Sequence, residues 1–376
     1  MLRIFATGDN HIGLRYAGHE QAAVLAGARS AAFETMVARA NEEECALFVI
    51  TGDLFENTYS VPKKDIKSLL DMLSCFHGTV ALLPGNHDHY EEDSKLWQYM
   101  KDLLPDYDNI LLLSRYRPYP LQLDGKDVVL YPALCTALHS LPGQNNLGWI
   151  KEEPMPSDGT FRIGIAHGAV EGETIDREGQ YYLMKRQELE NIPVDLWLIG
   201  HTHVPFPRNL TGEYTPCEKI LNAGTHVQTD VSCNTEGQCF VVELGEDKSV
   251  RAKKVPSGDL RFYRKHIALT AEKMEETLRE ELQDLPDGSV VDLVLSGAVT
   301  AAEYEDRDRI IEDLLARFVE GTYTDSGLSR LISKELIDAE FAETSLSASF
   351  LTALLEEPKQ AQLAYELLRS LKEGRA

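Results

Sequence analysis

Residues 2–11 read LRIFATGDNH, and this stretch joins a strand suited to a buried sheet to two metal-ligating side chains. The run at residues 2–7 is mostly apolar, as expected of a strand that is covered on both faces. Asp9 and His11 follow it, and side chains two residues apart in an extended chain point to the same side. The stretch therefore predicts a strand whose carboxyl end presents a carboxylate and an imidazole together.

Four more apolar runs, at residues 46–51, 79–83, 161–165 and 195–199, end in the same way. They lead into Gly-Asp, Gly-Asn-His-Asp, a single His before Gly, and Gly-His-Thr-His. The candidate metal ligands at the five strand ends are Asp9, His11, Asp53, Asn86, His167, His201 and His203. Oxygen and imidazole ligands without thiolates suit manganese, iron or zinc. A shared carboxylate would hold two ions about 3.5–4 Å apart, the arrangement that cleaves phosphate esters.

The alternative is that these are ordinary turn and capping residues of an α/β fold. That explanation requires five coincidences, each at the end of a strand, and we therefore prefer a metal site. His226 is a separate case, because a loop histidine there could line the cleft or have only a structural role.

This ordered set of motifs resembles the calcineurin-like metallophosphoesterase superfamily, whose pattern runs D-x-H, G-D, G-N-H-[DE], a lone His and G-H-x-H. The resemblance implies how the ligands are divided between the two ions. The first ion would be held by Asp9, His11 and His203, the second by Asn86, His167 and His201, and Asp53 would bridge them.

In that superfamily the histidine of the third motif is not a ligand. The resemblance implies that His87 lies beside the phosphate, where it would stabilise the transition state or protonate the leaving oxygen. Asp88 would hold the His87 ring by a hydrogen bond, which fixes the tautomer and direction of an imidazole. We therefore predict His87 and Asp88 as catalytic residues.

Gly13 after the first motif and Phe55 after the second resemble the SbcD-type DNA repair nucleases. This resemblance implies a phosphodiesterase that acts on DNA ends or single strands with two divalent ions, Mn²⁺ being expected and Fe²⁺ or Zn²⁺ being alternatives. Archaeal and eukaryotic counterparts carry a histidine where this chain has Glu56. Exonuclease action, endonuclease action and cleavage polarity therefore stay open.

Two other functions stay open as well. The same ligand set serves phosphatases or phosphodiesterases that act on small nucleotides. The choice of substrate depends on the surrounding loops and on a capping domain, and not on the metal ligands. A catalytically weak scaffold subunit of an SMC-like ATPase complex is the third possibility, and the completeness of the ligand set argues against it.

The order of the elements predicts the architecture. Strand–helix alternation followed by a strand-rich half indicates an α/β fold of two packed β-sheets flanked by helices. In this chain of 376 residues we expect a metallophosphoesterase (nuclease) domain at 1–255, a small α/β capping domain at 260–322 and a helical C-terminal arm at 323–376. Pro256-Ser257-Gly258 marks the first boundary.

The arm carries an apolar stripe, with Leu363, Leu367 and Leu371 at i, i+4 and i+8. Such a stripe suits a groove on a pair of partner helices, or it packs within its own chain. The resemblance implies an SbcC-type SMC-like ATPase as that partner, DNA as substrate, and a homodimer, which is common in the family.

Composition predicts an ordinary globular enzyme, with 43% hydrophobic and 26% charged residues. The formal net charge of −24 opposes non-specific attraction to nucleic acid. No apolar run reaches the ~20 residues of a membrane span, and the first residues lack a signal-peptide pattern. The six cysteines show no CxxC spacing, which indicates core thiols and a cytoplasmic protein without membrane contact.

Overall fold

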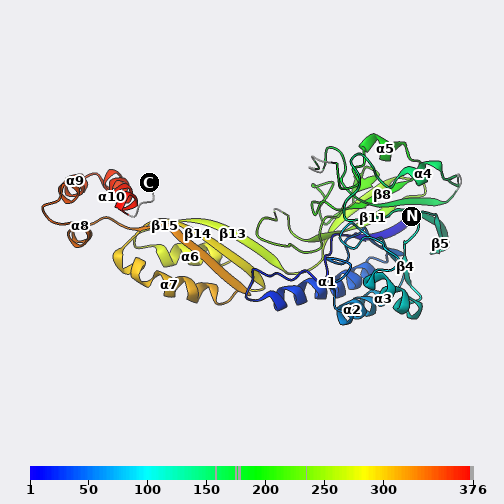
Figure 1. Ribbon diagram of the computed structural model, residues 1–376, viewed down its shortest axis with the longest axis horizontal. Coiled ribbons are helices and arrows are strands. Elements are labelled where there is room, and N and C mark those ends of the chain that lie inside the picture. Colours follow the sequence, from blue (N-terminus) through cyan, green and yellow to red (C-terminus); the bar gives the residue numbers. More distant parts are fainter. Residues whose placement is uncertain (157–158, 174–175, 177–178, 234, 373–376) are drawn as a thin grey trace. The chain divides into compact units, whose positions relative to one another are not determined.

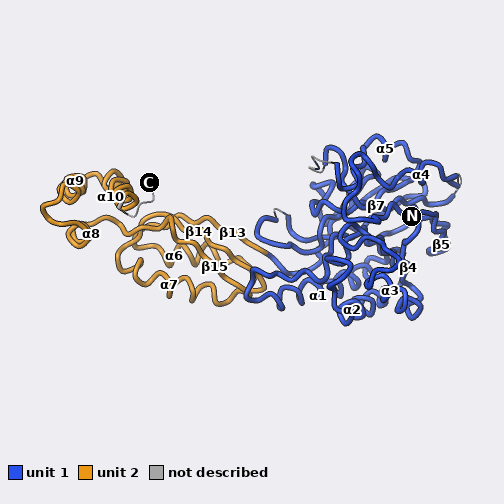
Figure 2. The backbone as a smooth tube through the Cα atoms, viewed as in Figure 1, with its two compact units in different colours: residues 1–261 blue, residues 262–376 orange. Residues whose placement is uncertain are grey.

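The computed structural model describes residues 1–156, 159–173, 176, 179–233 and 235–372. It divides the chain into two compact units, Met1–Arg261 and Phe262–Ala376 (Figure 2). The last four residues of the predicted arm, 373–376, lie outside the described residues.

The first unit contains a seven-stranded sheet of order β4-β3-β2-β1-β11-β12-β9. Its strands are β1 (Leu2–Thr7), β2 (Leu47–Ile50), β3 (Thr79–Leu82), β4 (Ile110–Leu112), β9 (Thr215–Cys217), β11 (Gln238–Leu244) and β12 (Val250–Pro256). The first four strands are parallel, so the carboxyl ends of β1, β2 and β3 meet at one edge. The antiparallel strand β11 covers the other side of β1, where Ile4 lies opposite Val242.

A five-stranded sheet of order β10-β8-β7-β6-β5 completes the sandwich. Its strands are β5 (Tyr119–Leu123), β6 (Lys126–Ala133), β7 (Phe161–His167), β8 (Leu196–Gly200) and β10 (Ile220–Leu221). Strands β6, β7, β8 and β10 are parallel, so β7 and β8 also end side by side. The ends of these two strands supply the remaining candidate ligands.

Helices cover the outer face of each sheet (Figure 1). They are α1 (Ala22–Glu42), α2 (Lys63–Ser74) and α3 (Lys95–Leu103, followed by the 3₁₀ turn Leu104–Asp106) on one sheet, and α4 (Gly148–Glu152) and α5 (Arg186–Asn191) on the other. The period of two in β1 explains the layers, because Ile4 packs between the sheets while Phe5 packs among α1 to α3. Trp197 of β8 likewise packs beside Leu189 of α5.

The prediction of an α/β fold with two packed sheets and flanking helices is therefore confirmed. The five predicted ligand-bearing strands form within about two residues of their expected bounds. Ser94 caps α3, since its hydroxyl accepts the N–H of Trp97 at 3.3 Å. Local sequence patterns do not predict the short elements β5, β9, α4 and α5, because three to six residues give too little periodicity to recognise.

The second unit holds a three-stranded sheet of order β13-β14-β15 and a group of helices. Its elements are β13 (Arg261–Thr270), α6 (Met274–Leu282), β14 (Ser289–Val299), α7 (Ala301–Leu315), β15 (Glu320–Arg330), α8 (Lys334–Glu340), α9 (Leu346–Leu354) and α10 (Pro358–Lys372). Leu278, Leu293 and Ile311 share its main core.

The strand β15 runs across residue 323, where the helical arm was expected to start. The parallel pairing of β14 with β15 extends from Glu320 to Arg330, and the first helix of the arm begins at Lys334. The local sequence pattern does not reveal this strand, since EGTYTDSGLSR contains few apolar residues and only two of its residues are buried. Backbone pairing with β14 determines the strand in spite of that composition.

Within the described part of the chain, no helix is both long and apolar enough to cross a membrane.

Candidate metal centre

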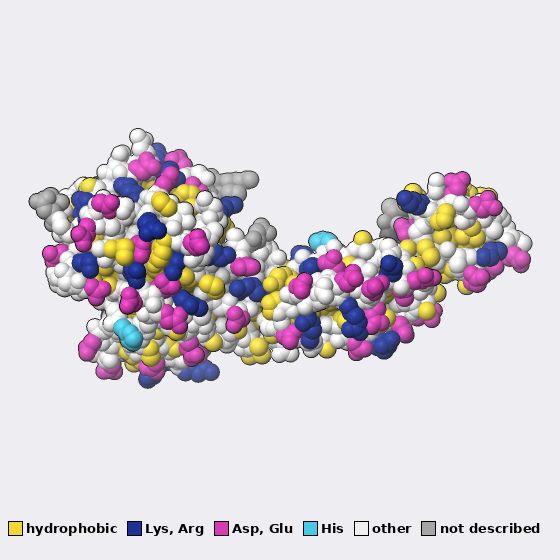
Figure 3. Space-filling model, turned by 180° about the vertical axis from the view of Figure 1, so that it is seen from behind, with side chains coloured by type: hydrophobic (Ala, Val, Ile, Leu, Met, Phe, Trp, Pro, Cys, Tyr) yellow, Lys and Arg dark blue, Asp and Glu magenta, His cyan; other side chains and the backbone are white. Residues whose placement is uncertain are grey.

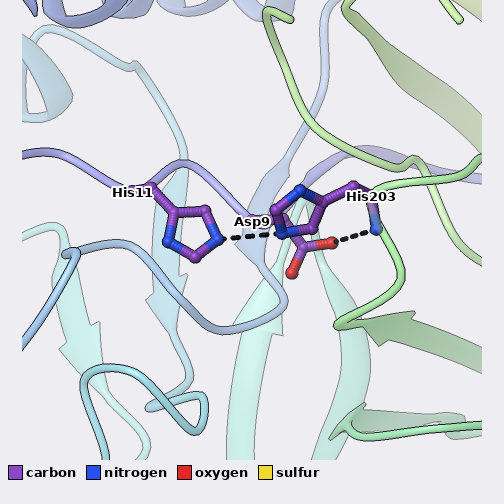
Figure 4. A group of neighbouring side chains, drawn as sticks. All are labelled: Asp9, His11 and His203. Atoms are coloured by element: carbon purple, nitrogen blue, oxygen red, sulfur yellow. Dashed lines mark hydrogen bonds between the residues drawn. The ribbon is translucent and has the colours of Figure 1, made fainter. Parts of the chain in front are cut away.

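Three predicted ligands of the first ion lie together (Figure 4). The Nε2 atoms of His11, after β1, and His203, after β8, are 2.9 Å apart. The carboxylate of Asp9 lies beside both and accepts the backbone N–H groups of His201 at 2.8 Å and His203 at 3.3 Å. These hydrogen bonds tie the loop after β8 to the loop after β1, which brings residues 192 positions apart into contact.

The three predicted ligands of the second ion also converge. The Oδ1 atom of Asn86 lies 2.9 Å from Nε2 of His167 and 3.0 Å from Nδ1 of His201. Asn86 follows β3 of one sheet, whereas His167 ends β7 of the other. The second group of ligands therefore exists only where the two sheets meet.

Asp53 lies between the two groups. Its Oδ2 atom is 3.3 Å from Nε2 of His167 and 3.8 Å from Nε2 of His11. That oxygen is buried and has no hydrogen-bond partner, while Oδ1 accepts the backbone N–H of His87 at 2.8 Å. A buried carboxylate oxygen without a donor is costly unless a cation reaches it. The donor set and this oxygen fit two divalent ions that share Asp53.

The charges at the site agree with cation binding. Burial lowers the pKa of His201 to about 4, with a further contribution from His167, and burial also lowers the pKa of His203. Both imidazoles are thus neutral and free to bind metal at neutral pH. Burial would lower the pKa of His167 as well, but the charge of Asp53 outweighs it and raises that pKa. A divalent cation at Asp53 would replace the proton that this pair attracts.

Hydrogen bonds to carbonyl groups set the tautomers of two histidines. The Nδ1–H of His167 donates to the carbonyl oxygen of Thr51 at 2.9 Å, which leaves Nε2 free to face Asp53. The Nδ1–H of His87 donates to the carbonyl oxygen of Glu56 at 3.1 Å. The Nδ1 atom of His11 lies 3.0 Å from the carboxylate of Glu56. Such partners of the second ring nitrogen orient metal-binding imidazoles.

His87 lies beside the candidate ligands His11 and Asp53, but Asp88 does not hold its ring. The His87 ring is half-buried and meets the His11 ring edge-on, with centroids 4.7 Å apart. The Asp88 carboxylate instead accepts the backbone N–H groups of Phe55 at 3.0 Å and Gly85 at 2.7 Å. The prediction that His87 donates to Asp88 is therefore wrong. The Asp88 carboxylate instead joins the loop after β2 to the loop after β3. The carbonyl of Glu56 orients His87 in its place.

Several ligands occupy a strained backbone conformation. Positive φ angles, in the region that favours glycine, occur at Asp9, His11, Asp53, His201 and His203. A non-glycine residue there costs about 1–3 kcal/mol, and such strain concentrates at functional sites. Surrounding contacts must therefore hold these loops in place.

Arg29, which lies outside the ligand motifs of the sequence, provides one such set of contacts. It lies fully buried on α1, and its guanidinium donates to the carbonyl oxygens of Asp9 at 3.2 Å and Asn10 at 2.6 Å. It also donates to the carbonyls of Val227 and Gln228, both at 3.3 Å. The arginine thus joins the first ligand loop to the 225–228 segment. Its position four residues after Leu25 and four before Phe33, both buried, was the available signal.

Two glycines of the motifs are required by close contacts. A Cβ atom on Gly52, whose φ is +106°, would lie 2.2 Å from Nδ1 of His167. A Cβ atom on Gly85 would lie 2.2 Å from Oδ1 of Asp53. Any side chain at either position would displace a ligand.

His226 is structural. Its ring is buried, its Nε2–H donates to the carbonyl oxygen of Arg29 at 2.9 Å, and it packs on Phe33 with centroids 5.4 Å apart. Burial and the charge of Arg29 hold its pKa well below the usual range. It supports α1 and does not line the cleft.

A pocket of about 410 Å³ opens beside the first group of ligands. It is lined by His11, Leu14, Tyr16, Ala17, Gly18, His19, Glu56, His87, His203, Thr229 and Asp230. His87 and the candidate ligands His11 and His203 line this pocket, so it lies directly beside the metal centre.

Two groups of imidazole and oxygen ligands that share one carboxylate, with a further imidazole beside them, define a metal-dependent hydrolase of phosphoric esters. The chain belongs to the calcineurin-like phosphoesterase family, whose sequence profile matches residues 2–205. Members of this family use divalent metal ions.

Solved structures similar to this chain include protein TT1561 of Thermus thermophilus, with 12% identity and a TM-score of 0.39, covering 67% of this chain and 97% of that one. A dimetal phosphatase from Danio rerio has 10% identity and a TM-score of 0.35, covering 68% of this chain and 98% of that one. A comparison with curated proteins gave no match.

Proposed function

We propose that the protein is a two-metal phosphodiesterase that hydrolyses DNA, as in the SbcD-type nucleases. The observation that carries the hydrolytic part is the unpartnered, buried Oδ2 of Asp53 between two groups of oxygen and imidazole ligands. The DNA part is supported by Gly13 and Phe55 in the motifs and by the presence of a second unit after the phosphoesterase unit. We propose Mn²⁺ as the native ion, as the resemblance to the SbcD-type nucleases implies; the oxygen and imidazole ligands also suit Fe²⁺ or Zn²⁺.

Bound ions would activate water and neutralise charge on the phosphate oxygens. The chain's own residues provide the orientation. The ring of His87 is fixed through Nδ1, so its Nε2 is the nitrogen left to meet the substrate. Its backbone N–H donates to Asp53, which couples its position to the shared ligand. As an imidazolium, with Nε2 protonated as well as Nδ1, His87 would supply a hydrogen bond to the phosphate or a proton to its leaving oxygen.

Hydrolysis of small nucleotides is the rival that a specific observation favours. The net charge of −24 opposes a long polyanion, and Glu56 and Asp230 add two carboxylates to the pocket beside the ligands. A small substrate with one scissile phosphate would meet less of this repulsion than a DNA strand.

One set of assays separates these functions. We expect the Mn²⁺-loaded protein to hydrolyse bis(p-nitrophenyl) phosphate and to degrade labelled DNA, and EDTA to abolish both activities. Hydrolysis of the small diester and of dinucleotides, but not of DNA, would favour the small-nucleotide enzyme. Failure to hydrolyse any ester with Mn²⁺, Fe²⁺ or Zn²⁺ would leave the scaffold role.

We also propose a helical partner for the C-terminal arm, namely the coiled coil of an SbcC-type ATPase. Leu363, Leu367 and Leu371 on α10 are 59%, 57% and 63% exposed. Leu346 and Phe350 on α9 are also exposed, and Figure 3 shows hydrophobic side chains gathered on these C-terminal helices. Apolar residues at this spacing suit a groove between two helices.

The opposite face of α10 is already used within the second unit. Ala361 and Tyr365 are buried in a cluster with Leu336 of α8 and Leu351 of α9. Gln362 accepts the backbone N–H of Ile332 at 2.8 Å, which anchors α10 to the end of β15. Truncation of the arm would remove this core, so substitutions in the exposed stripe give a sharper test.

Replacing Leu363, Leu367 and Leu371 together by Ser should leave the melting temperature nearly unchanged, since exposed positions cost within about 0.5 kcal/mol each. Hydrolysis of the small diester should persist, while co-purification with the ATPase is lost. The matched control is Leu351→Ser, at a fully buried position, which should lower the melting temperature clearly. Unchanged co-purification of the triple variant would exclude the stripe as the docking surface. A homodimer and a cytoplasmic location remain predictions of the sequence.

A further inference from the structure

Glu56 occupies a position beside the metal centre that no ligand motif includes. Its backbone N–H donates to the carbonyl oxygen of Ile12 at 3.0 Å, and the backbone N–H of His11 donates to that of Asp53 at 2.9 Å. These bonds place Glu56 directly beside the first ligand loop. Its carboxylate reaches Nδ1 of His11 at 3.0 Å, while the side chain remains 28% exposed toward the pocket.

The pocket that Glu56 faces carries negative charge, which is unusual for an enzyme that acts on phosphoric esters. Glu56 and Asp230 are its two carboxylates, and no Lys or Arg occurs among the described residues that line it. Arg29 is buried behind Asp9 and donates to backbone carbonyls there. Apart from a protonated His87, positive charge for the substrate therefore has to come from the metal ions.

A phosphate monoester and a phosphate diester differ in charge. The monoester carries about −1.5 to −2 at pH 7, whereas the diester carries one negative charge. The ions would bind the scissile phosphate of either ester, but the additional charge of the monoester would face a carboxylate. Like charges at short distance repel more strongly at a partly buried site than in water.

We propose that Glu56 determines specificity for phosphate diesters by repelling monoesters and terminal phosphates, with Asp230 contributing at the rim of the pocket. This inference rests on the proposed phosphoesterase function and names the residue that selects the ester class. The pocket then receives the uncharged part of the substrate, such as a nucleoside, next to the scissile phosphate. The carboxylate that orients His11 thus also excludes the wrong ester.

The test compares two esters that share one leaving group, bis(p-nitrophenyl) phosphate and p-nitrophenyl phosphate, with Mn²⁺. The native protein should prefer the diester in kcat/KM. Glu56→Gln keeps an oxygen that accepts from His11 but removes the charge, so the preference should shift toward the monoester by about 10-fold. Asp230→Asn, at a side chain that accepts hydrogen bonds from Thr229 and Ser232, should shift it in the same direction by a smaller factor.

Glu246→Gln, an exposed carboxylate outside the pocket, is the matched control and should leave the preference unchanged. Measurement of the metal content of Glu56→Gln shows whether a changed ester preference comes from the lost charge or from lost metal. If Glu56→Gln loses metal, the diester-to-monoester ratio of kcat/KM in Asp230→Asn decides whether pocket carboxylates select the ester. A native preference for the monoester, or ratios within twofold of native in both pocket variants, would overturn the proposal. Hydrolysis of the small diester without cleavage of DNA would refute DNA as substrate while leaving this inference standing.

Discussion

Replacing Asp53 by Asn is expected to release both metal ions and to abolish hydrolysis, while the protein stays folded. The amide keeps the size of the side chain, but it removes the one negative charge that both groups of ligands share. Activity should fall by more than about 10³-fold, beyond the ~10²–10³-fold that loss of one preorganised donor costs. Metal content by mass spectrometry, hydrolysis of a small diester and circular dichroism measure the three effects.

His11→Ala is the comparison for this variant. His11 contacts His203 in the first group of ligands, so its loss should weaken mainly one ion. Asn86, His167 and His201 would keep the second ion together with Asp53. Two tightly bound Mn²⁺ ions and normal activity in Asp53→Asn would show that Asp53 is not the bridge.

His87→Ala should lose turnover and keep its metals. General acid–base groups typically contribute 10²–10⁴-fold, so we expect kcat to fall by about that factor with little change in metal content. The leaving group distinguishes the two roles left open for His87. If His87 protonates the leaving oxygen, the loss of kcat should be larger for DNA than for a nitrophenyl ester. The leaving group of DNA is a sugar alkoxide that needs a proton, whereas nitrophenolate leaves readily without one.

Equal losses for both leaving groups would indicate that His87 stabilises charge on the phosphate without transferring a proton. His77→Ala, at an exposed position away from the ligands, is the histidine control and should behave as native. Release of metal from His87→Ala would instead mean that His87 is a ligand, an arrangement that its closeness to His11 and Asp53 permits.

The loop after β1 shows how much of the site the local sequence predicts. Asp9 and His11 follow a buried strand, and the same local pattern recurs at four other strand ends. Parallel strands bring their carboxyl ends to one edge of a sheet, so local patterns predict that ligands of the same sheet meet. The packing of the two sheets decides that Asn86 meets His167 and His201. The polar strand β15 shows the opposite case, because its pairing with β14 and not its composition determines it.

By itself, then, the sequence determined the α/β class and predicted the seven candidate ligands and the role of His87, because these depend on strand periodicity and on motifs of a few residues. The tertiary structure alone decided which oxygen of Asp53 lacks a partner, that Asp88 binds Phe55 and Gly85, and that Glu56 orients both His11 and His87. It also revealed Arg29 behind the first ligand loop. The contacts of Arg29 join residues up to 199 positions apart along the chain. Such pairings depend on how two sheets and a helix pack, and no local pattern carries that information.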